Sequence, residues 1–400
     1  MKHWFLTLMI AFCTISVFIL FIIYPQETLE ASLNGLNVWG KIIFPSLLPF
    51  FILSELLISF GVVRFIGVLF EPIMRPIFNI PGAGSFAWII GMASGYPSGA
   101  KITAKLREEE QLSKIEAERI IAYSNNASPL FIFGAVAVGM FHDAQLGLLI
   151  AVCHYMGNMI IGFCMRFYGT KSESPKKITE KNFSLKQAFN QMHLTRIRDT
   201  RPFGTVLSDA VIQSIQTLLL IGGFIILFSV LSNLLIVIES TQIIVWTIAG
   251  ILSALSISTE FSFSIFTGLF ELSLGSYLIA NEDAGSLLQK LILVSFLLGF
   301  NGFSVHAQVA SILAKTDISF APYFFARIMH GIIASILTIF LFSPMYLSKQ
   351  GAKLETMPVS QEPVFSFFAF TLEKMMIYGT FITITAIGIA SILYIQRTYK

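Results

Sequence analysis

Long apolar runs dominate the hydropathy pattern of this chain. Several are about 20 residues long, the length at which a helix crosses the hydrocarbon core of a bilayer. They are residues 4–24, 146–167, 215–238, 291–313, 322–342 and 375–394. Shorter or punctuated apolar runs lie between them. The pattern predicts an all-α polytopic membrane protein.

Composition supports this class. The chain has 55% hydrophobic and 12% charged residues and a mean hydropathy of +0.77, which leaves too little polar surface for a soluble globule of 400 residues. Cys13, Cys153 and Cys164 lie inside apolar runs without metal-ligand spacing. We therefore expect free thiols, no metal site, no cofactor and no nucleic-acid partner.

Polar clusters repeat at a nearly constant distance along the chain. Residues 124–128 (SNNAS) match 300–304 (FNGFS), so that Asn125 corresponds to Asn301 and Ser128 to Ser304, 176 residues apart. A second match, 51–57 against 229–235, has an offset of 178. Duplicated membrane halves with polar, broken helices are typical of carriers whose binding site lies between the repeats.

Charge in the connecting segments predicts the topology. Segment 169–205 carries eight basic and three acidic residues, whereas 344–371 is balanced. By the positive-inside rule the former is cytoplasmic and the latter extracytoplasmic, so the second repeat is inverted. The expected order is a transmembrane signal anchor (1–25), repeat 1 (26–168), a basic cytoplasmic linker (169–205), inverted repeat 2 (206–343), an extracytoplasmic loop (344–371) and a C-terminal transmembrane helix (372–400).

Within repeat 1, Pro45 and Pro49 are expected to interrupt the first apolar span, because proline removes backbone hydrogen bonds that lipid cannot replace. Residues 62–80 contain two arginines and two prolines, and this segment is either interfacial or packed inside the protein. Residues 101–123 carry balanced charges that predict a water-facing helical hairpin.

The strongest sign of a helix break is residues 91–101 (GMASGYPSGAK), which follow an apolar run. A broken helix is tolerated in a membrane only where it is buried in protein or lines a cavity. A helix restarting at Ser98 or Gly99 would direct backbone amides at the break, and Lys101 would add a charge, which suits an anionic ligand. The counterpart, 267–276, keeps the glycines and adds Glu271, a candidate for ion coupling or for a structural pairing.

Both repeats place small polar residues at the start of their next apolar segment. The candidate substrate-binding residues are Ser94, Gly95, Ser98, Gly99, Lys101, Asn125, Asn126, Ser128, Asn301, Gly302, Ser304, His306 and Gln308. Amide side chains offer both donors and acceptors, so two inverted sets would build one central polar site. The alternative is that these residues hold helices together without binding a substrate.

Enzyme activity has little support. Ser98 and Lys101 match a Ser-x-x-Lys nucleophile pattern, but the companion motifs of that pattern are missing. Residues 95–101 lack the spacing and the Ser or Thr of a phosphate-binding loop. His154 and His330 each lie in an apolar span, where a hydrogen-bonded packing role is favoured. We expect a protein that is not an enzyme.

At these residues the chain also resembles a known family. The motifs GMASGYPSGAKIT, IEAER, SNNASPLFIFGAV and GFNGFSVHAQ resemble the YlbJ (SpoVV) family of sporulation integral membrane proteins of endospore-forming bacteria. That family contains the nucleoside-recognition, or gate, domain and is similar to concentrative nucleoside transporters. The resemblance implies inverted repeats with re-entrant helical hairpins, and movement of dipicolinate from the mother cell across the outer forespore membrane.

The expected function is therefore transport of a small organic anion, dipicolinate, by an integral multi-pass protein of the outer forespore membrane. Dipicolinate is a dianion with a ring nitrogen, and Lys101, His306 and the asparagines offer complementary donors. The expected partners are this substrate, the lipid bilayer, a coupling ion (H⁺ or Na⁺) and further copies of the chain in a homo-oligomer. The alternative is a non-transporting membrane scaffold or signalling protein needed for spore cortex assembly.

Overall fold

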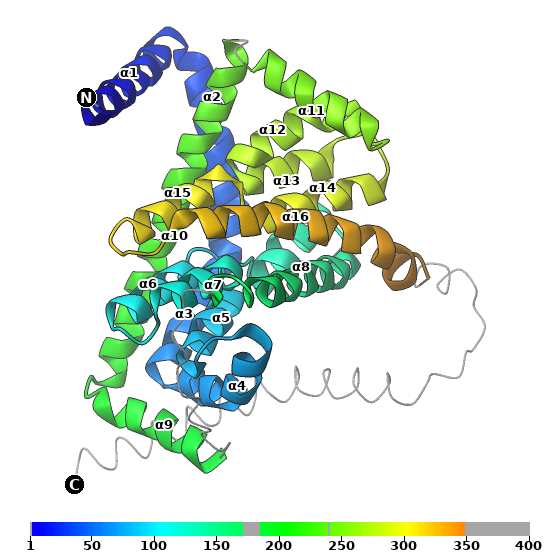
Figure 1. The fold of residues 1–400 in the computed structure, drawn as a ribbon. Coiled ribbons are helices and arrows are strands. Elements are labelled where there is room, and N and C mark those ends of the chain that lie inside the picture. The colour runs from blue at the N-terminus through cyan, green and yellow to red at the C-terminus, as the bar shows by residue number, and fades with distance from the viewer. Residues whose placement is uncertain (1, 171–184, 239–240, 349–400) are drawn as a thin grey trace. The chain divides into compact units, whose positions relative to one another are not determined.

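The computed structural model describes residues 2–170, 185–238 and 241–348 (Figure 1). Within these ranges every regular element is helical. Four helices there are long and apolar enough to cross a membrane, and a pair bent by 100° at Tyr24 adds a fifth candidate. The protein is thus polytopic, as its hydropathy predicts. The apolar run 375–394 and the loop 349–371 lie outside the described residues.

The first half of the chain contains one long series of helices. They are α1 (Lys2–Ile23), α2 (Pro25–Val38), a π-helical turn (Trp39–Ile43), α3 (Phe44–Ser59), α4 (Val62–Phe78), α5 (Gly82–Ser94), α6 (Ser98–Glu108), α7 (Lys114–Ser124), a π-helix (Phe131–Met140) and α8 (Ala144–Met165). Two breaks, between α5 and α6 and after α7, fall in this series.

The second half follows α9 (Leu185–Arg198). It contains α10 (Phe203–Val237), α11 (Gln242–Ala254), a 3₁₀ turn (Thr259–Phe261), α12 (Ser262–Phe270), α13 (Leu272–Asn281), α14 (Leu287–Phe300), α15 (Gly302–Leu313), α16 (Phe320–Phe342) and a π-helical turn (Ser343–Leu347). The order of long helix, short helix, broken pair, second broken pair and long helix recurs from the first half.

The prediction that Pro45 and Pro49 interrupt the helix is wrong. The chain stays helical through both prolines, and Pro45 comes just after a π-helical turn that continues into α3. The irregularity lies just before them, where the N–H of Phe44 bonds the carbonyl of Trp39 in a π-helical turn. The expected span 291–313 falls within the candidate span Leu287–Leu313, in which Asn301, with a φ of +81°, separates α14 from α15.

The water-facing hairpin expected over 101–123 is only partly observed. Lys101, Lys105 and Glu108 of α6 are exposed, but Glu118 and Arg119 of α7 are buried. Glu118 accepts a hydrogen bond from the Tyr168 hydroxyl (3.0 Å), and Arg119 donates to the carbonyls of Tyr168 (2.8 Å) and Asn79 (3.1 Å). Because these hydrogen bonds pair both charged side chains with polar groups of neighbouring segments, α7 can lie inside the protein.

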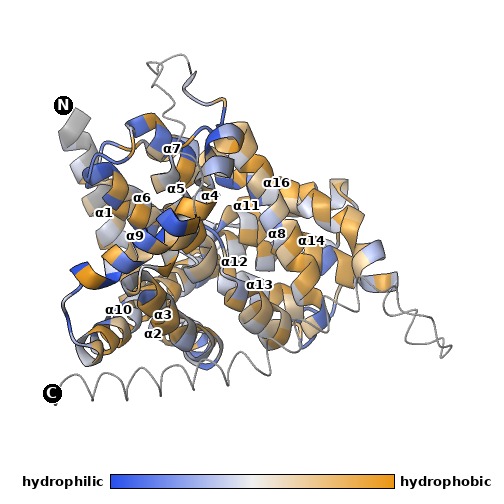
Figure 2. Ribbon diagram, turned by 90° about the horizontal axis from the view of Figure 1, so that it is seen from below, coloured by the Kyte–Doolittle hydropathy of each residue, from blue (hydrophilic) through white to orange (hydrophobic). Residues whose placement is uncertain are grey.

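The helix α10 packs along α2 and α3 (Figure 1). The Trp39 indole donates to the Leu218 carbonyl (2.9 Å) and the Ser229 hydroxyl to the Ala31 carbonyl (2.7 Å). Elsewhere α16 packs against both α8 and α14, and Figure 2 shows that these three helices are largely hydrophobic, whereas α9 carries hydrophilic residues. The packing brings the two halves of the chain together around their breaks.

Candidate functional site

The first break is a tight turn at residues 95–97, after which α6 begins at Ser98 as the sequence predicts. Gly95 has a φ of +81°, a conformation that glycine adopts without steric cost. A Cβ atom at Gly91 would lie 1.5 Å from the Ser124 carbonyl oxygen, and one at Gly99 would lie 2.0 Å from it. The glycines therefore allow the α5–α6 hairpin to pack directly on the end of α7.

The second hairpin, α12–α13, has Glu271 at its break. Glu271 has extended backbone angles, and its carboxylate accepts a hydrogen bond from the Leu274 N–H (2.7 Å), so it caps the start of α13. The arms of the hairpin approach closely, because a Cβ at Gly275 would lie 2.1 Å from the Gly268 Cα. Glu271 is only 2% exposed, which makes it a buried acid that both caps a helix and faces the interior.

The corresponding asparagines of the two halves share one hydroxyl group. Asn125 donates to the Tyr323 hydroxyl (3.0 Å). We orient the Asn301 amide so that its nitrogen donates to the Leu298 carbonyl (2.8 Å) and its oxygen accepts from the Tyr323 hydroxyl (3.2 Å). The opposite amide orientation would direct the Asn301 oxygen at backbone carbonyls. All three side chains are fully buried, so they form a polar contact between the breaks.

Arg327 of α16 lies beside this contact. Its guanidinium donates to the carbonyls of Asn125 (3.1 Å) and Ala122 and to the Asn158 side-chain oxygen (3.2 Å). Sequence reasoning missed Arg327 and Tyr323, since both lie in the apolar run 322–342. An arginine inside such a run is itself a functional signal, and that rule could have identified it.

A small cavity lies where the breaks of both halves meet, and we call it the central cavity. Its volume is about 40 Å³. Its polar lining includes Ser94, Gly95, Ser128, Glu271, Ser273, Ser304 and Gln308. The side-chain oxygen of Gln308 is buried and has no hydrogen-bond partner in the described part of the chain. Such a volume holds water molecules or an ion and is too small for an organic dianion.

Ser98 and Lys101 lie in a different place from the one expected. They line a second cavity of about 370 Å³, the linker-side cavity, together with Glu55, Arg201 and Asp209. Ser98 and Lys101 are three residues apart and therefore share a face of α6, and that face is turned towards α3 and α10. Ser94 lines both cavities.

The remaining candidate residues are packed in the interior. Asn126 donates to the Tyr123 carbonyl (2.8 Å), and Gly302 follows Asn301 with a φ of +70°. His306 is surrounded by aromatic rings, including Phe300 at 4.8 Å between centroids. His154 and His330 contact each other through a His330 ring nitrogen and the His154 carbonyl (2.8 Å). These contacts fit packing roles.

A third cavity, the distal cavity, has a volume of about 580 Å³. The same two helical stretches line all three cavities in order. On α10 the linker-side cavity is lined by Asp209, Gln213 and Thr217, the central cavity by Ile221 and Ile225, and the distal cavity by Ser229, Ser232 and Ile236. On α2–α3 the linker-side cavity is lined by Ser59 and Glu55, the central cavity by Phe51, Leu47 and Ile43, and the distal cavity by Val38, Asn34 and Ala31. The spacing of three to five residues keeps each set on one helix face.

A family model described as a gate domain, nucleoside recognition, matches residues 41–142, which include the α5–α6 break and Asn125. The chain is 52% identical to the sporulation integral membrane protein YlbJ of Bacillus subtilis (strain 168) over 325 residues, 81% of this chain and 79% of the relative. It is 31% identical to an uncharacterized protein of Alkalihalophilus pseudofirmus over 120 residues, 29% of this chain and 26% of that one. No solved structure matches the chain.

Proposed function

The chain belongs to the family of the sporulation integral membrane protein YlbJ, and on this premise we propose that it is a membrane carrier for a small organic anion. Gate-domain membrane families are typically transporters rather than enzymes. The protein is an integral, multi-pass membrane protein tied to sporulation. The proposed substrate is dipicolinate, moved out of the mother cell across the outer forespore membrane, as the family resemblance implies.

The observation that carries this proposal is the line of three cavities along α10 and α2–α3. On α10 the lining residues run from Val206 to Ile236, which corresponds to about 45 Å of helix. The hydrocarbon core of a bilayer is about 30 Å thick. Two large cavities separated by a small, polar central one are what a carrier requires when it is closed in the middle of its path.

The central cavity supports an inverted-repeat arrangement. Its polar lining comes from the α5–α6 break and Ser128 in the first half and from Glu271, Ser304 and Gln308 in the second. Asn125 and Asn301, corresponding residues of the two halves, meet at Tyr323. We propose that 26–168 and 206–343 are repeats related by an axis in the membrane plane, because carriers of that kind place their site between the repeats.

Glu271 is the proposed group for ion coupling. It lines a cavity whose other polar groups, such as Ser128, Ser304 and Gln308, are neutral. Hard cations prefer carboxylate, hydroxyl and amide oxygens, so the central cavity suits H⁺ or Na⁺ better than an anion.

The substitution Glu271→Gln separates the roles of this residue, because glutamine can still accept from the Leu274 N–H but carries no charge. We expect the variant to fold and to lose gradient-driven accumulation, and full accumulation would remove Glu271 from coupling.

The experiment for the proposed function is uptake of radiolabelled dipicolinate by vesicles that contain the purified protein. Ser304 lines the central cavity, and Ser304→Leu should block the path and abolish uptake. Ser253 is exposed on α11, so Ser253→Leu is the matched control and should leave uptake unchanged. A scaffold or signalling protein, the alternative function, would show no uptake with either variant or with the unchanged protein.

A further inference from the structure

We propose that the linker-side cavity is a binding site for a small dicarboxylate, in which Lys101 holds one carboxylate before the anion reaches the central cavity. This inference rests on the proposed carrier function and assigns anion recognition to a different place from ion coupling. The volume of about 370 Å³ falls within the range of about 300–1,000 Å³ that is usual for small-molecule pockets.

The charges of this cavity leave Lys101 available. Arg201 is committed to two acids, with contacts to Asp199 (2.7 Å) and Asp209 (2.6 Å). Lys105 lies 4.0 Å from Glu109. Lys101 makes no direct hydrogen bond or ion pair among the residues that the structure describes, but the carboxylate of Glu55 lines the same cavity and attracts Lys101 electrostatically. An ammonium group with three free donors can bind a carboxylate.

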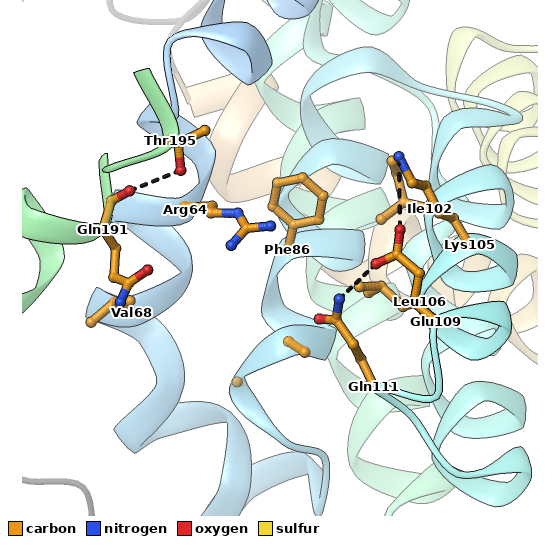
Figure 3. Close-up of a pocket in the computed structure, with 12 residues that line it drawn as sticks. Arg64, Val68, Phe86, Ile102, Lys105, Leu106, Glu109, Gln111, Gln191 and Thr195 are labelled. Atoms are coloured by element: carbon orange, nitrogen blue, oxygen red, sulfur yellow. Dashed lines mark hydrogen bonds and ion pairs between the residues drawn. The ribbon is translucent and has the colours of Figure 1, made fainter. Parts of the chain in front are cut away.

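A neighbouring cavity extends the positive charge around α6. It has a volume of about 360 Å³ and lies between α4, α5, α6 and α9. Figure 3 shows the Arg64 guanidinium pointing into it beside Phe86, on the side opposite Lys105 and Glu109. Ile102 and Lys105 line both this cavity and the linker-side cavity. Arg64 and Lys101 thus place one cation on either side of α6, beside the acids Glu109 and Glu55 of the two cavities.

Ser94 and Ser98 connect the proposed anion site with the centre of the molecule. Both line the linker-side cavity, and Ser94 also lines the central cavity. Their hydroxyls can donate to the second carboxylate of a ligand held by Lys101. The distal cavity also contains a lysine, Lys41, beside Asn34, Asn37, Asn233 and Asn281. The linker-side cavity differs in combining its lysine with Ser94 and Ser98, which do not line the distal cavity.

The test uses a cysteine reporter in the cavity and does not depend on transport. Gln213 is exposed and lines the linker-side cavity, so Gln213→Cys is introduced after Cys13, Cys153 and Cys164 are changed to serine. The purified protein is treated with methanethiosulfonate reagents of negative and of positive charge. We expect Lys101→Gln to lower the ratio of the two reaction rates, negative over positive, about tenfold, and Lys101→Arg to retain most of it. Lys315 is an exposed lysine outside this cavity, and Lys315→Gln should leave the ratio unchanged.

The ligand itself gives a second readout. Dipicolinate should slow modification of Gln213→Cys, whereas its neutral diamide, which has the same shape, should not. A rate ratio that is insensitive to Lys101→Gln, or equal protection by the diamide, would overturn the proposal. Protection without vesicle uptake would contradict the carrier function and leave the anion site standing, whereas uptake without protection would contradict the site alone.

Discussion

Among single residues, Arg327 has the largest expected effect on stability. Its guanidinium is fully buried and donates to Asn125, Ala122 and Asn158. Arg327→Met removes these donors, and each buried acceptor left unpaired costs about 1–3 kcal/mol. We expect a large fall in the thermal unfolding temperature of the purified protein, and a smaller one for Arg327→Lys, which keeps the charge but loses the planar fork.

Arg198 provides the control for this prediction, because it is exposed on α9. Arg198→Met should change the unfolding temperature little. Equal stability of Arg327→Met and the unchanged protein would show that the guanidinium does not hold the end of α7.

The helix breaks depend on glycines that permit close backbone contact. A Cβ at Gly91 would lie 1.5 Å from the Ser124 carbonyl oxygen, whereas a Cβ at Gly223 would have no atom within 4 Å. Gly91→Ala should therefore destabilise the protein by about 1–3 kcal/mol or more, and Gly223→Ala should be neutral or stabilise α10 by up to about 1 kcal/mol. Unfolding of both variants in detergent measures the difference, and equal effects would contradict the observed packing of the α5–α6 hairpin.

An ion pair joins the end of α6 to the loop before α16. Arg107 donates to both carboxylate oxygens of Asp317, at 2.9 and 2.8 Å. The hydrogen bonds from Arg107 lower the pKa of Asp317 below its ordinary value. A lowered carboxyl pKa contributes stability that is present above the unfolded-state pKa, about 3.9 for aspartate, and is lost as pH falls through the folded-state pKa.

Stability measurements at several pH values test this pair. Asp317→Asn should cost about 0.2–1 kcal/mol at neutral pH, because the pair is partly exposed, and the difference should vanish in acid. Asp283 is exposed, so Asp283→Asn is the control and should have little effect. A cost for Asp317→Asn that persists in acid would mean that the carboxylate charge is not responsible.

The elements differ in how well the sequence predicts them. The break at residues 95–97 and the polar positions Asn125, Asn301 and Glu271 were predictable, because glycine, proline and polar side chains stand out in apolar runs. The burial of α7 was not, since Glu118 and Arg119 find partners in Tyr168 and Asn79, which are distant in sequence. The prediction that Pro45 and Pro49 interrupt the helix was wrong, because the chain forms a π-helical turn before them and stays helical.

For the whole molecule, the candidate site separates into parts that spacing alone could not distinguish. Ser94, Gly95 and Ser128 line the central cavity, whereas Ser98 and Lys101 line the linker-side cavity. The sequence places these residues in one motif, but the turn at 95–97 sends the two sides of the motif to different cavities. Which cavity a helix face lines depends on tertiary packing. The sequence could therefore predict which residues are candidates for a site, but not which cavity each of them lines.

The inverted-repeat topology predicts that segments 169–205 and 344–371 lie on opposite sides of the membrane. The positive-inside rule places the first in the cytoplasm, and an odd number of crossings in repeat 2 places the second outside. Reporter fusions or labelling of single cysteines in each segment measure the sidedness. Both segments on the same side would contradict the inverted repeat.

Flux of dipicolinate into vesicles measures whether this protein alone transports the anion. Vesicles that contain only this protein should accumulate radiolabelled dipicolinate above protein-free vesicles. Asn125→Leu and Asn301→Leu should each abolish this accumulation while the protein stays inserted, because they remove the paired amides where the two halves meet. Accumulation no greater than in protein-free vesicles, or unchanged accumulation in both variants, would contradict the account.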